Sequence, residues 1–405
     1  MNKLEIRERL VNQLKYLKTL SNREYLLLRK YNELENEIKK DKNYFDKVEQ
    51  IINDYVLSPK DLNLIVNNIL DKGESFIENK LNLDIKFVNS KEDNNIWTKL
   101  RQTISVLYWN QNPGRNIKFF VTLNNKIIGL LSLGSDVMSI GVRDKYIGWN
   151  KEQKLVKKRI NNLMIVSSII PIQPLGYNLV GGKLISLMLY HNKIREVFRE
   201  KYNQELVGLT TTSLFGIKRS QYNGFPKYWK PLGETIGTLK LSPLEDVYSL
   251  MREWLKENYK KEYEFVQTKT GPKQNVIHLF YKKSDFNKYW KEETGLRIKD
   301  LNQEFKRGVY FAKLYDNTLN FLRCEIEEKD LKSRNNLDFD INNTNNSIMK
   351  YWWKKWGYKR YNKLKNNNKL TNKIWWIDLR NNNSIISLEE FMNRNNQWQG
   401  NNFKK

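Results

Sequence analysis

The spacing of apolar residues predicts helices at the start of the chain. Over residues 1–57, apolar side chains recur every three or four positions with charged residues between them, without a proline or glycine. This pattern predicts an N-terminal helical hairpin in which Ser21 or Asn22 caps the second helix. The two amphipathic helices also offer a surface for a second copy of the chain or for a partner protein.

Residues 58–114 continue as a helical lead-in to the next region. Ser58, Pro59 and Asp61 form a typical helix start, because serine caps the first turn, proline fits its first position and the carboxylate returns the cap. A second helical pattern in this region ends before Pro113.

From residue 115 the pattern changes to short apolar runs that predict strands. Two runs flank Asn124 and Asn125, and an Asn-Asn pair favours the tight turn of a hairpin. Residues 138–142 are expected to continue as a strand. The mostly apolar segment 157–172 predicts a further strand that is buried on both faces.

Helical and strand patterns alternate through the rest of the middle region. We expect a helix over 178–202, a strand that runs into a loop over 205–216, a helix over 242–263 capped by Ser242, and partial helix over 301–326. The fold class that follows is α/β (α+β): a mixed sheet with appended helices over 115–330. Residues 331–405 form a basic extension rich in Asn, Lys and aromatic residues.

The charge balance points to a polyanionic partner. Lys and Arg number 71 against 45 Asp and Glu, which gives a formal net charge of +26. A field of this sign attracts nucleic acid, so DNA is the expected partner. The alternative is codon bias, because an AT-rich genome inflates Lys, Asn, Ile and Tyr without any selection for binding.

Several classes of protein are disfavoured by what the sequence contains. Cys324 is the single cysteine, so neither an intramolecular disulfide nor a cysteine-based zinc site is expected, and His191 and His278 are far apart in the sequence. The N-terminus is charged throughout, and the longest apolar run is too short to span a bilayer. We therefore expect a soluble protein of the bacterial cytoplasm without a membrane partner.

Three stretches are candidates for chemistry, and each has a structural alternative. Residues 171–186 combine a turn, paired glycines and a helix start, which suits a bound phosphate but also suits close packing. Residues 210–237 form a loop rich in hydroxyls, which either line a site or cap loop backbone. Within residues 143–149, Arg143 and Asp144 are either a local ion pair or an acid–base site.

The aromatic and basic stretch 350–361 has two interpretations. Its rings can stack on unpaired bases while Lys and Arg hold phosphates. Alternatively its rings are buried on the core while the lysines extend into solvent, and we expect burial for most of them.

Six short stretches, taken in order, resemble the DruA-like family linked to Druantia anti-phage systems and also found in phages and mobile elements. They cover roughly residues 100–330 and read NNKIIGLLSLGSDV, RDKYIGW, NLVGGKL, TTSLFGIKRSQYN, LGETIGT and RGVYFAKLYDNTLNFL. More loosely, the resemblance implies a core like that of the GNAT acyltransferases and their Mom-type DNA-modifying branch. In such a core a hairpin, a central strand, a glycine-containing loop and a helix hold acyl-CoA.

The resemblance implies a cofactor loop and a reacting end. The residues that would hold the pyrophosphate of a cofactor, with acyl-CoA the candidate, are Gln173, Gly176, Asn178, Gly181, Gly182 and Lys183. The residues that would line the reacting end are Arg143, Asp144, Ser213, Ser220, Gln221 and Tyr222, with Asp144 or Tyr222 handling protons. The residues expected to contact nucleic acid are Trp149, Lys218, Arg219, Lys354, Lys355 and Arg360.

Three functions remain open from the sequence. The favoured one is a DNA-associated protein of phage or anti-phage biology that modifies bases by group transfer. The second is a nuclease-like enzyme that binds a metal through Asp136, Asp144 and Glu234. The third is a DNA-binding recruitment subunit without catalysis. The first requires that segment 143–149, the paired glycines and the hydroxyl-rich loop converge in one cleft.

Overall fold

The computed structural model describes residues 2–63, 82–109, 114–214, 216–217, 220–269, 271–334, 344–371, 379–381 and 384–394. Contacts divide the chain into two compact units, which are described separately below. One contains Met1–Asn36, Ile236–Lys306 and Ser387–Lys405, and the other contains Glu37–Thr235 and Arg307–Ile386. Residues 236–306 are therefore an insertion into the region that the sequence pattern assigned to a single core.

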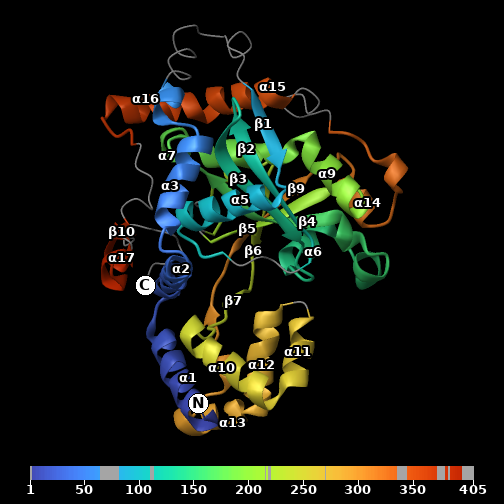
Figure 1. Cartoon of the computed structure of the whole chain (residues 1–405). Coiled ribbons are helices and arrows are strands. Elements are labelled where there is room, and N and C mark those ends of the chain that lie inside the picture. The colour runs from blue at the N-terminus through green and yellow to red at the C-terminus, as the bar shows by residue number, and fades with distance from the viewer. Residues whose placement is uncertain are drawn as a thin grey trace. The chain divides into compact units, whose positions relative to one another are not determined.

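The first unit is mainly helical. It contains α1 (Lys3–Thr19), α10 (Glu245–Asn258), α11 (Lys260–Gln267), α12 (Pro272–Lys283), α13 (Phe286–Thr294) and α17 (Leu388–Arg394), with a short ribbon of β7 (Thr238–Leu239) and β8 (Gln303–Glu304) (Figure 1). Helix α1 packs on α10 and α13. The 242–263 helix is divided at Tyr259, and its first cap is Leu244, so the prediction of Ser242 as cap is wrong.

Residues 1–57 are helical as predicted, but they form three helices rather than the two of the predicted hairpin. Helix α2 (Asn22–Lys40) starts at Ser21, whose hydroxyl accepts from the Glu24 amide while Glu24 accepts from the Ser21 amide. A third helix, α3 (Tyr44–Tyr55), completes the 1–57 region. Ser58 and Asp61 form the same reciprocal cap at the start of the next helical segment, whose later part lies outside the described residues.

The second unit is built on a seven-stranded sheet, and the predicted mixed α/β class is confirmed. Its strand order is β1-β2-β3-β4-β5-β9-β6, and neighbouring strands are antiparallel except for β4 and β5. The strands are β1 (Leu83–Phe87), β2 (Asn116–Leu123), β3 (Lys126–Ser135), β4 (Leu163–Pro171), β5 (Gly208–Ser213), β6 (Lys230–Glu234) and β9 (Gly308–Lys313). The predicted hairpin is β2–β3, where Asn124 and Asn125 both adopt the left-handed conformation of its tight turn.

Helices cover both faces of this sheet. Side chains alternate between the faces along a strand, so adjacent residues of β3 contact different layers. Leu130 packs with Trp97 and Leu100 of α5 (Lys91–Ile104). The next position, Gly129, faces Ile185 of α8 (Gly181–Leu187) on the other side. An added Cβ on Gly129 would lie 2.4 Å from Ile185 Cδ1, so a larger residue there would have to displace the Ile185 side chain.

Several predicted elements differ from the observed ones. Residues 138–142 form a bend and the start of α6 (Gly141–Ile147), so the predicted strand is wrong. The predicted 178–202 helix is divided into α7 (Leu175–Asn178), α8, a 3-10 turn and α9 (Asn192–Tyr202), because Val180 is left-handed and His191 is extended. Partial helix over 301–326 is confirmed for α14 (Thr318–Leu322), but the strand β9 was not anticipated.

The C-terminal part of the second unit is helical. It contains α15 (Thr344–Trp352), a π-helical turn over Trp353–Gly357 and α16 (Tyr358–Asn366). Trp352 and Trp353 are buried, which confirms the interpretation that most rings of the 350–361 stretch pack on the core.

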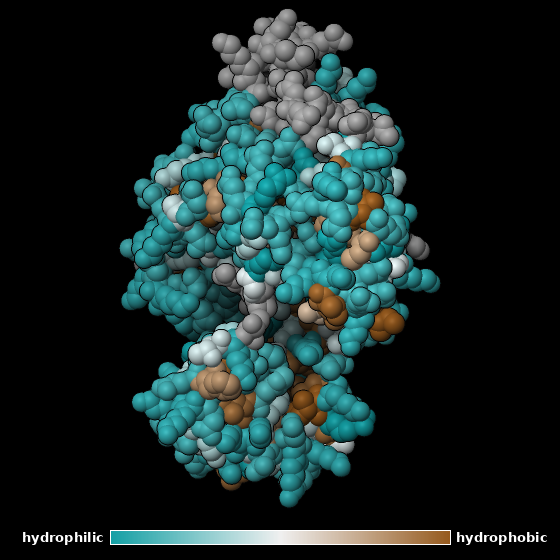
Figure 2. Space-filling view, turned by 90° about the vertical axis from the view of Figure 1, so that its right-hand side faces the viewer, coloured by the Kyte–Doolittle hydropathy of each residue, from teal (hydrophilic) through white to brown (hydrophobic). Residues whose placement is uncertain are grey.

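The face of the molecule in Figure 2 is mainly hydrophilic, with hydrophobic side chains in small groups. Within the described ranges, no helix has both the length and the apolar character needed to cross a bilayer.

Candidate functional site

Arg143 is the centre of a buried ionic cluster at the start of α6. Its side chain is fully buried, and its guanidinium contacts Asp136 Oδ1 at 2.8 Å and Asp144 Oδ1 at 2.7 Å. Thr210 on β5 donates to Asp136 Oδ2 at 2.7 Å, and Lys154 contacts Asp144 Oδ2 at 2.8 Å. All four carboxylate oxygens of the two acids are therefore engaged within the protein.

The electrostatics of this cluster favour a structural role. Burial raises the pKa of Asp136, although the charge of Arg143 and the hydrogen bond from Thr210 oppose that shift. Partial burial would also raise the pKa of Asp144, but hydrogen bonds from Lys154 and Arg143 outweigh it and hold that pKa below its ordinary value. A carboxylate with a lowered pKa and two cationic partners is a weak base, so the cluster fixes α6 to the sheet rather than presenting a proton acceptor.

A second cluster joins the hydroxyl-rich loop to β5 and β9. The Tyr222 hydroxyl lies 3.2 Å from Thr211 Oγ1 and accepts from Gln221 Nε2 at 3.2 Å, while the Tyr310 hydroxyl donates to Asn223 Oδ1 at 2.9 Å. The rings of Tyr222 and Tyr310 are 4.9 Å apart. Burial raises the pKa of Tyr222, which keeps its hydroxyl protonated at neutral pH, so no phenolate is available there to accept a proton.

The two clusters lie on opposite faces of the sheet. Thr210 contacts the Arg143 cluster and Thr211 contacts Tyr222, and adjacent residues of a strand point in opposite directions. Their partners on β9 agree, because Phe311 contacts Tyr146 of α6 whereas Tyr310 contacts Tyr222. The prediction that segment 143–149, the paired glycines and the hydroxyl-rich loop share one cleft is therefore wrong.

The other predicted residues of the reacting end and the aromatic wall are buried or partly buried. Ser213 ends β5 and pairs with Gly308, and the Ser220 hydroxyl accepts from the Tyr222 amide. Trp149 is only 9% exposed, and Arg143 and Lys154 lie over its ring at 5.6 and 6.0 Å. Trp149 thus packs on the ionic cluster.

The predicted cofactor loop is engaged by other parts of the chain. An added Cβ on Gly182 would lie 2.4 Å from Gln221 Oε1, and Lys183 donates to the carbonyls of Gln221 and Asn223. Asn178 exchanges two hydrogen bonds with the backbone of Thr371. An added Cβ on Gly181 would meet the Leu175 carbonyl oxygen at 2.9 Å.

The remaining loop residues are also used locally. Gln173 accepts from the Tyr177 amide at 2.6 Å, and an added Cβ on Gly176 would lie 3.2 Å from the Gln173 side chain. The start of α8 is therefore covered by the 220–223 segment. The residues present do not fit a bound acyl-CoA pyrophosphate in this arrangement.

A cationic groove that the sequence analysis missed lies beside β2 in the second unit. It encloses about 710 Å³, and its lining includes four cationic side chains and two aromatic rings but, among the described residues, no carboxylate. The lining residues are Phe87, Val88, Asn89, Ser90, Lys91, Asn94, Gly114, Arg115, Asn116, Lys118, Lys201 and Tyr202. We refer to this set as the β2 groove.

The geometry of the β2 groove holds two of its cations in fixed positions. Lys118 lies over the rings of Trp97 at 4.6 Å and Trp109 at 4.5 Å, and its ammonium donates to Asn94 Oδ1 at 2.7 Å. Arg115 lies over the Tyr202 ring at 5.3 Å and donates to the Asn161 carbonyl at 2.7 Å. A lysine within the mostly apolar strand NIKFFVTL was the signal available in the sequence.

Comparison with known proteins places the chain in a family. The family described as Druantia protein DruA matches residues 28–324, which is more than half of the chain. The chain belongs to the DruA family. A DruA-family relative, the Druantia protein DruA of Escherichia coli (strain UMEA 4076-1), is 27% identical over 239 residues, which cover 54% of this chain and 56% of the relative. The chain thus spans little more than half the length of that relative.

The DruA-family match includes the β2 groove but ends before the C-terminal helices. Of the predicted nucleic-acid contacts, Lys218 and Arg219 lie outside the described residues. Lys354 is exposed, Lys355 donates to the Tyr351 hydroxyl at 2.9 Å, and Arg360 lies over the Tyr177 ring at 4.5 Å. A role for these three cations in binding DNA stays a prediction.

If a polyanion such as DNA binds in the β2 groove, raising the pH is expected to weaken that binding through Lys118. Burial lowers the pKa of Lys118 to about 8, whereas ordinary lysines titrate near about 10.4. Lys118 therefore loses its proton between about pH 7 and about pH 9, while exposed lysines keep theirs. We expect duplex affinity to fall about three-fold over this range. Fluorescence anisotropy of a labelled duplex measures it, and Lys118→Arg should flatten the pH dependence; a wild-type affinity independent of pH would contradict the assignment.

Proposed function

We propose that this DruA-family protein acts in anti-phage defence by binding DNA through the β2 groove. Membership of a family linked to Druantia anti-phage systems supports the biological role. The net charge of +26 supports a polyanionic partner in general terms. The proposal concerns binding, and it does not depend on the identity of any reaction.

The observation that carries the proposal is the composition of the groove. Four cations converge in the groove from different elements: Lys91 from α5, Arg115 from the residue before β2, Lys118 from β2 and Lys201 from α9. The described lining contains no carboxylate. Cations without acidic neighbours attract phosphates, and contacts of this kind supply most of the affinity for a DNA backbone. Phe87 and Tyr202 add aromatic surface of the type that packs on sugars and bases.

The arrangement of the sheet supports a GNAT-like core as part of the proposal. Strands β2 and β3 form a hairpin, β4 follows as a central strand, and a turn with glycines leads into α8. The parallel pairing of β4 with β5 extends over only Leu163–Val166, although β4 continues to Pro171. The two strands thus separate towards the Tyr222 cluster.

Group transfer and metal-dependent cleavage find less support than binding does. The cofactor loop is covered by Gln221, and the oxygens of Asp136 and Asp144 are engaged by cations, the backbone and Thr210. Within the described ranges, no three His, Cys, Asp or Glu side chains are grouped so that they could hold a metal. Both activities remain predictions from the sequence.

Reversing two exposed charges of the groove tests the proposal. The double variant Lys91→Glu/Lys201→Glu is expected to weaken duplex binding about 30-fold and to reduce the slope of log affinity against log salt by about two. Both side chains are exposed, so the fold should be retained. Anisotropy titrations between about 50 and about 200 mM salt measure both quantities.

A matched control separates the groove from net charge. The variant Lys60→Glu/Lys329→Glu changes two exposed lysines outside the groove lining and lowers the net charge by the same amount, from +26 to +22. It should lose only a small part of the affinity through long-range attraction. Equal losses in both variants would show that DNA does not bind in the groove.

A further inference from the structure

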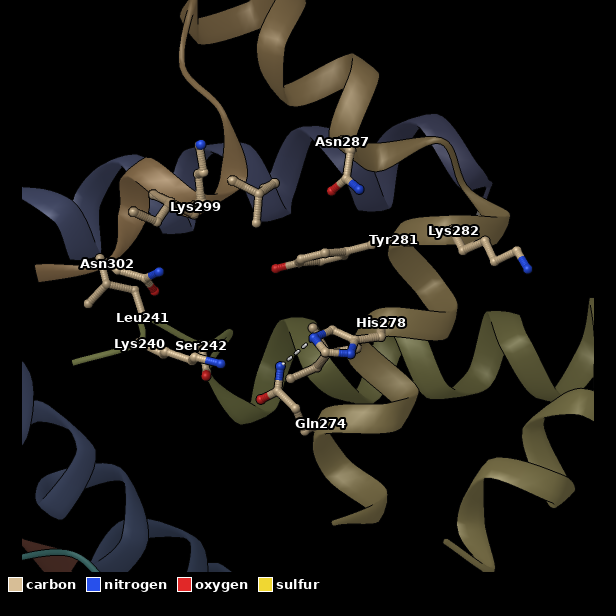
Figure 3. A pocket seen from close by; sticks show the side chains of 13 residues that line it. Lys240, Leu241, Ser242, Gln274, His278, Tyr281, Lys282, Asn287, Lys299 and Asn302 are labelled. Carbon is tan, nitrogen blue, oxygen red and sulfur yellow. Dashed lines mark hydrogen bonds between the residues drawn. The ribbon is translucent and has the colours of Figure 1, made fainter. Parts of the chain in front are cut away.

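The first unit contains a cavity that no predicted site includes. It encloses about 430 Å³ between one face of α12, the segment that follows β7 and the short helix Ile298–Leu301 (Figure 3). Its size is that of a small-molecule pocket. The cavity is lined by Lys240, Leu241, Ser242, Gln274, Ile277, His278, Tyr281, Lys282, Asn287, Ile298, Lys299, Leu301 and Asn302.

Tyr281 projects into this cavity with an unused hydroxyl. The residue is 9% exposed, and its ring is held by Phe286 at a centroid distance of 4.8 Å. Figure 3 shows the hydroxyl pointing into the open space, and it has no hydrogen-bond partner among the described residues. A mostly buried phenol whose hydroxyl opens into a cavity is free to form a hydrogen bond with a ligand bound there.

The remaining polar groups of the lining surround the same space. Gln274 and His278 lie one helical turn apart and are joined by a 3.0 Å hydrogen bond between Gln274 Nε2 and His278 Nε2. Asn302 and Asn287 contribute amides from other segments. Apolar side chains complete the lining: Leu241, Ile277, Ile298 and Leu301.

The charge of the lining restricts the ligand further. Three lysines and no carboxylate line the cavity within the described residues. The ammonium of Lys282 extends away from the cavity in Figure 3, so its charge does not lie at the centre of the lining. A ligand with a neutral flat part and an attached anion matches this distribution.

We propose that the cavity binds one unpaired nucleobase of a nucleotide. The amides of Gln274, Asn287 and Asn302 can donate and accept at the edge of a base, and the Tyr281 and His278 rings offer aromatic surface. The phosphate would remain outside, near the lysines. This inference rests on the proposed function, because a DNA-binding protein would present the base as part of a single strand; a free nucleotide carries the same chemistry.

The experiment compares two single-stranded oligonucleotides of equal length, one normal and one with abasic sites. Both carry the same phosphates, so contacts with the backbone cancel in the ratio of their affinities. We expect the wild-type protein to prefer the normal strand about ten-fold.

Three variants test which residues produce this preference. Tyr281→Phe should reduce the preference for the normal strand about three-fold. Gln274→Ala, at an exposed position, should also reduce it, and the fold should be retained. Tyr263→Phe, at an equally buried tyrosine outside the cavity, should leave it unchanged.

The outcomes are distinguishable from failure of the groove. If wild type binds normal and abasic strands equally well, the base pocket is wrong while DNA binding stands. If neither single strand binds, the base pocket is wrong, and the duplex titrations decide the groove separately. Competition with a mixture of the four nucleoside 5′-monophosphates separates the two sources: displacement at micromolar concentration identifies a free nucleotide as the ligand, and its absence together with a base preference identifies the strand.

Discussion

Replacing Arg143 with leucine is expected to lower the free energy of unfolding by about 3–5 kcal/mol. The substitution leaves the Asp136 carboxylate without its 2.8 Å ionic partner, and both side chains are fully buried. It also removes the guanidinium that contacts Asp144. Chemical denaturation followed by intrinsic fluorescence measures the loss. The affinity of the remaining folded protein for DNA should be close to that of wild type.

Two further variants establish the cause. Adding Asp136→Asn to Arg143→Leu removes the unpaired charge and should recover about 1–2 kcal/mol. Arg9→Leu breaks the exposed pair with Glu5 and should cost less than about 1 kcal/mol. If the Arg143→Leu protein were as stable as wild type, the ion pairs of Arg143 would not stabilise the fold. Arg143 would then be a candidate binding residue, because binding residues are often retained at a cost to stability.

Local features of the fold were predictable because short-range chemistry determines them. The turn at Asn124 and Asn125 needs two left-handed residues, which asparagine tolerates, and the caps at Ser21 and Ser58 need an acid three positions later. The prediction of a strand over residues 138–142 was wrong. The apolar pattern of this segment resembles a strand, but α6 begins at Gly141, and Arg143 within that helix forms an ion pair with Asp136.

The relation between candidate segments could not be predicted from their order. Whether residues 143–149 and the paired glycines share a cleft depends on which face of the sheet each helix covers. That is decided by the alternation at Thr210 and Thr211 and by the path of the chain between the strands. A hydroxyl-rich sequence such as TTTS gives no indication that its neighbouring threonines serve separate clusters.

The β2 groove escaped the sequence analysis because its cations are dispersed. Lys91, Arg115, Lys118 and Lys201 belong to different elements, and each is one of 71 basic residues in the chain. The sheet brings them together by pairing β1 with β2 and by placing the end of α9 beside Asn116, whose carbonyl accepts from Lys201 at 3.0 Å. Only Lys118, on an apolar strand, stands out in the sequence.

Substituting alanine for Gly308 is expected to destabilise the second unit by about 3 kcal/mol. An added Cβ would lie 2.6 Å from the carbonyl carbon of Gly216 and 2.9 Å from the Ile217 amide nitrogen. These are backbone atoms, so no side chain can rotate to relieve the contact. Gly308 also pairs with Ser213 and Glu234 at the start of β9, which limits how far the strand can move. Chemical denaturation measures the loss of stability.

The same substitution should loosen the loop that carries Tyr222, because the Tyr310 hydroxyl joins β9 to the Ile217 carbonyl at 3.0 Å. Gly141→Ala is the matched control, since no described heavy atom lies within 4 Å of the added Cβ and Gly141 is the first residue of α6. There we expect a stability equal to wild type or up to about 1 kcal/mol higher, because alanine restricts the unfolded chain. If Gly308→Ala were as benign as Gly141→Ala, the 216–217 turn could not pack against β9 as described, and the link between the loop and the sheet would have to be abandoned.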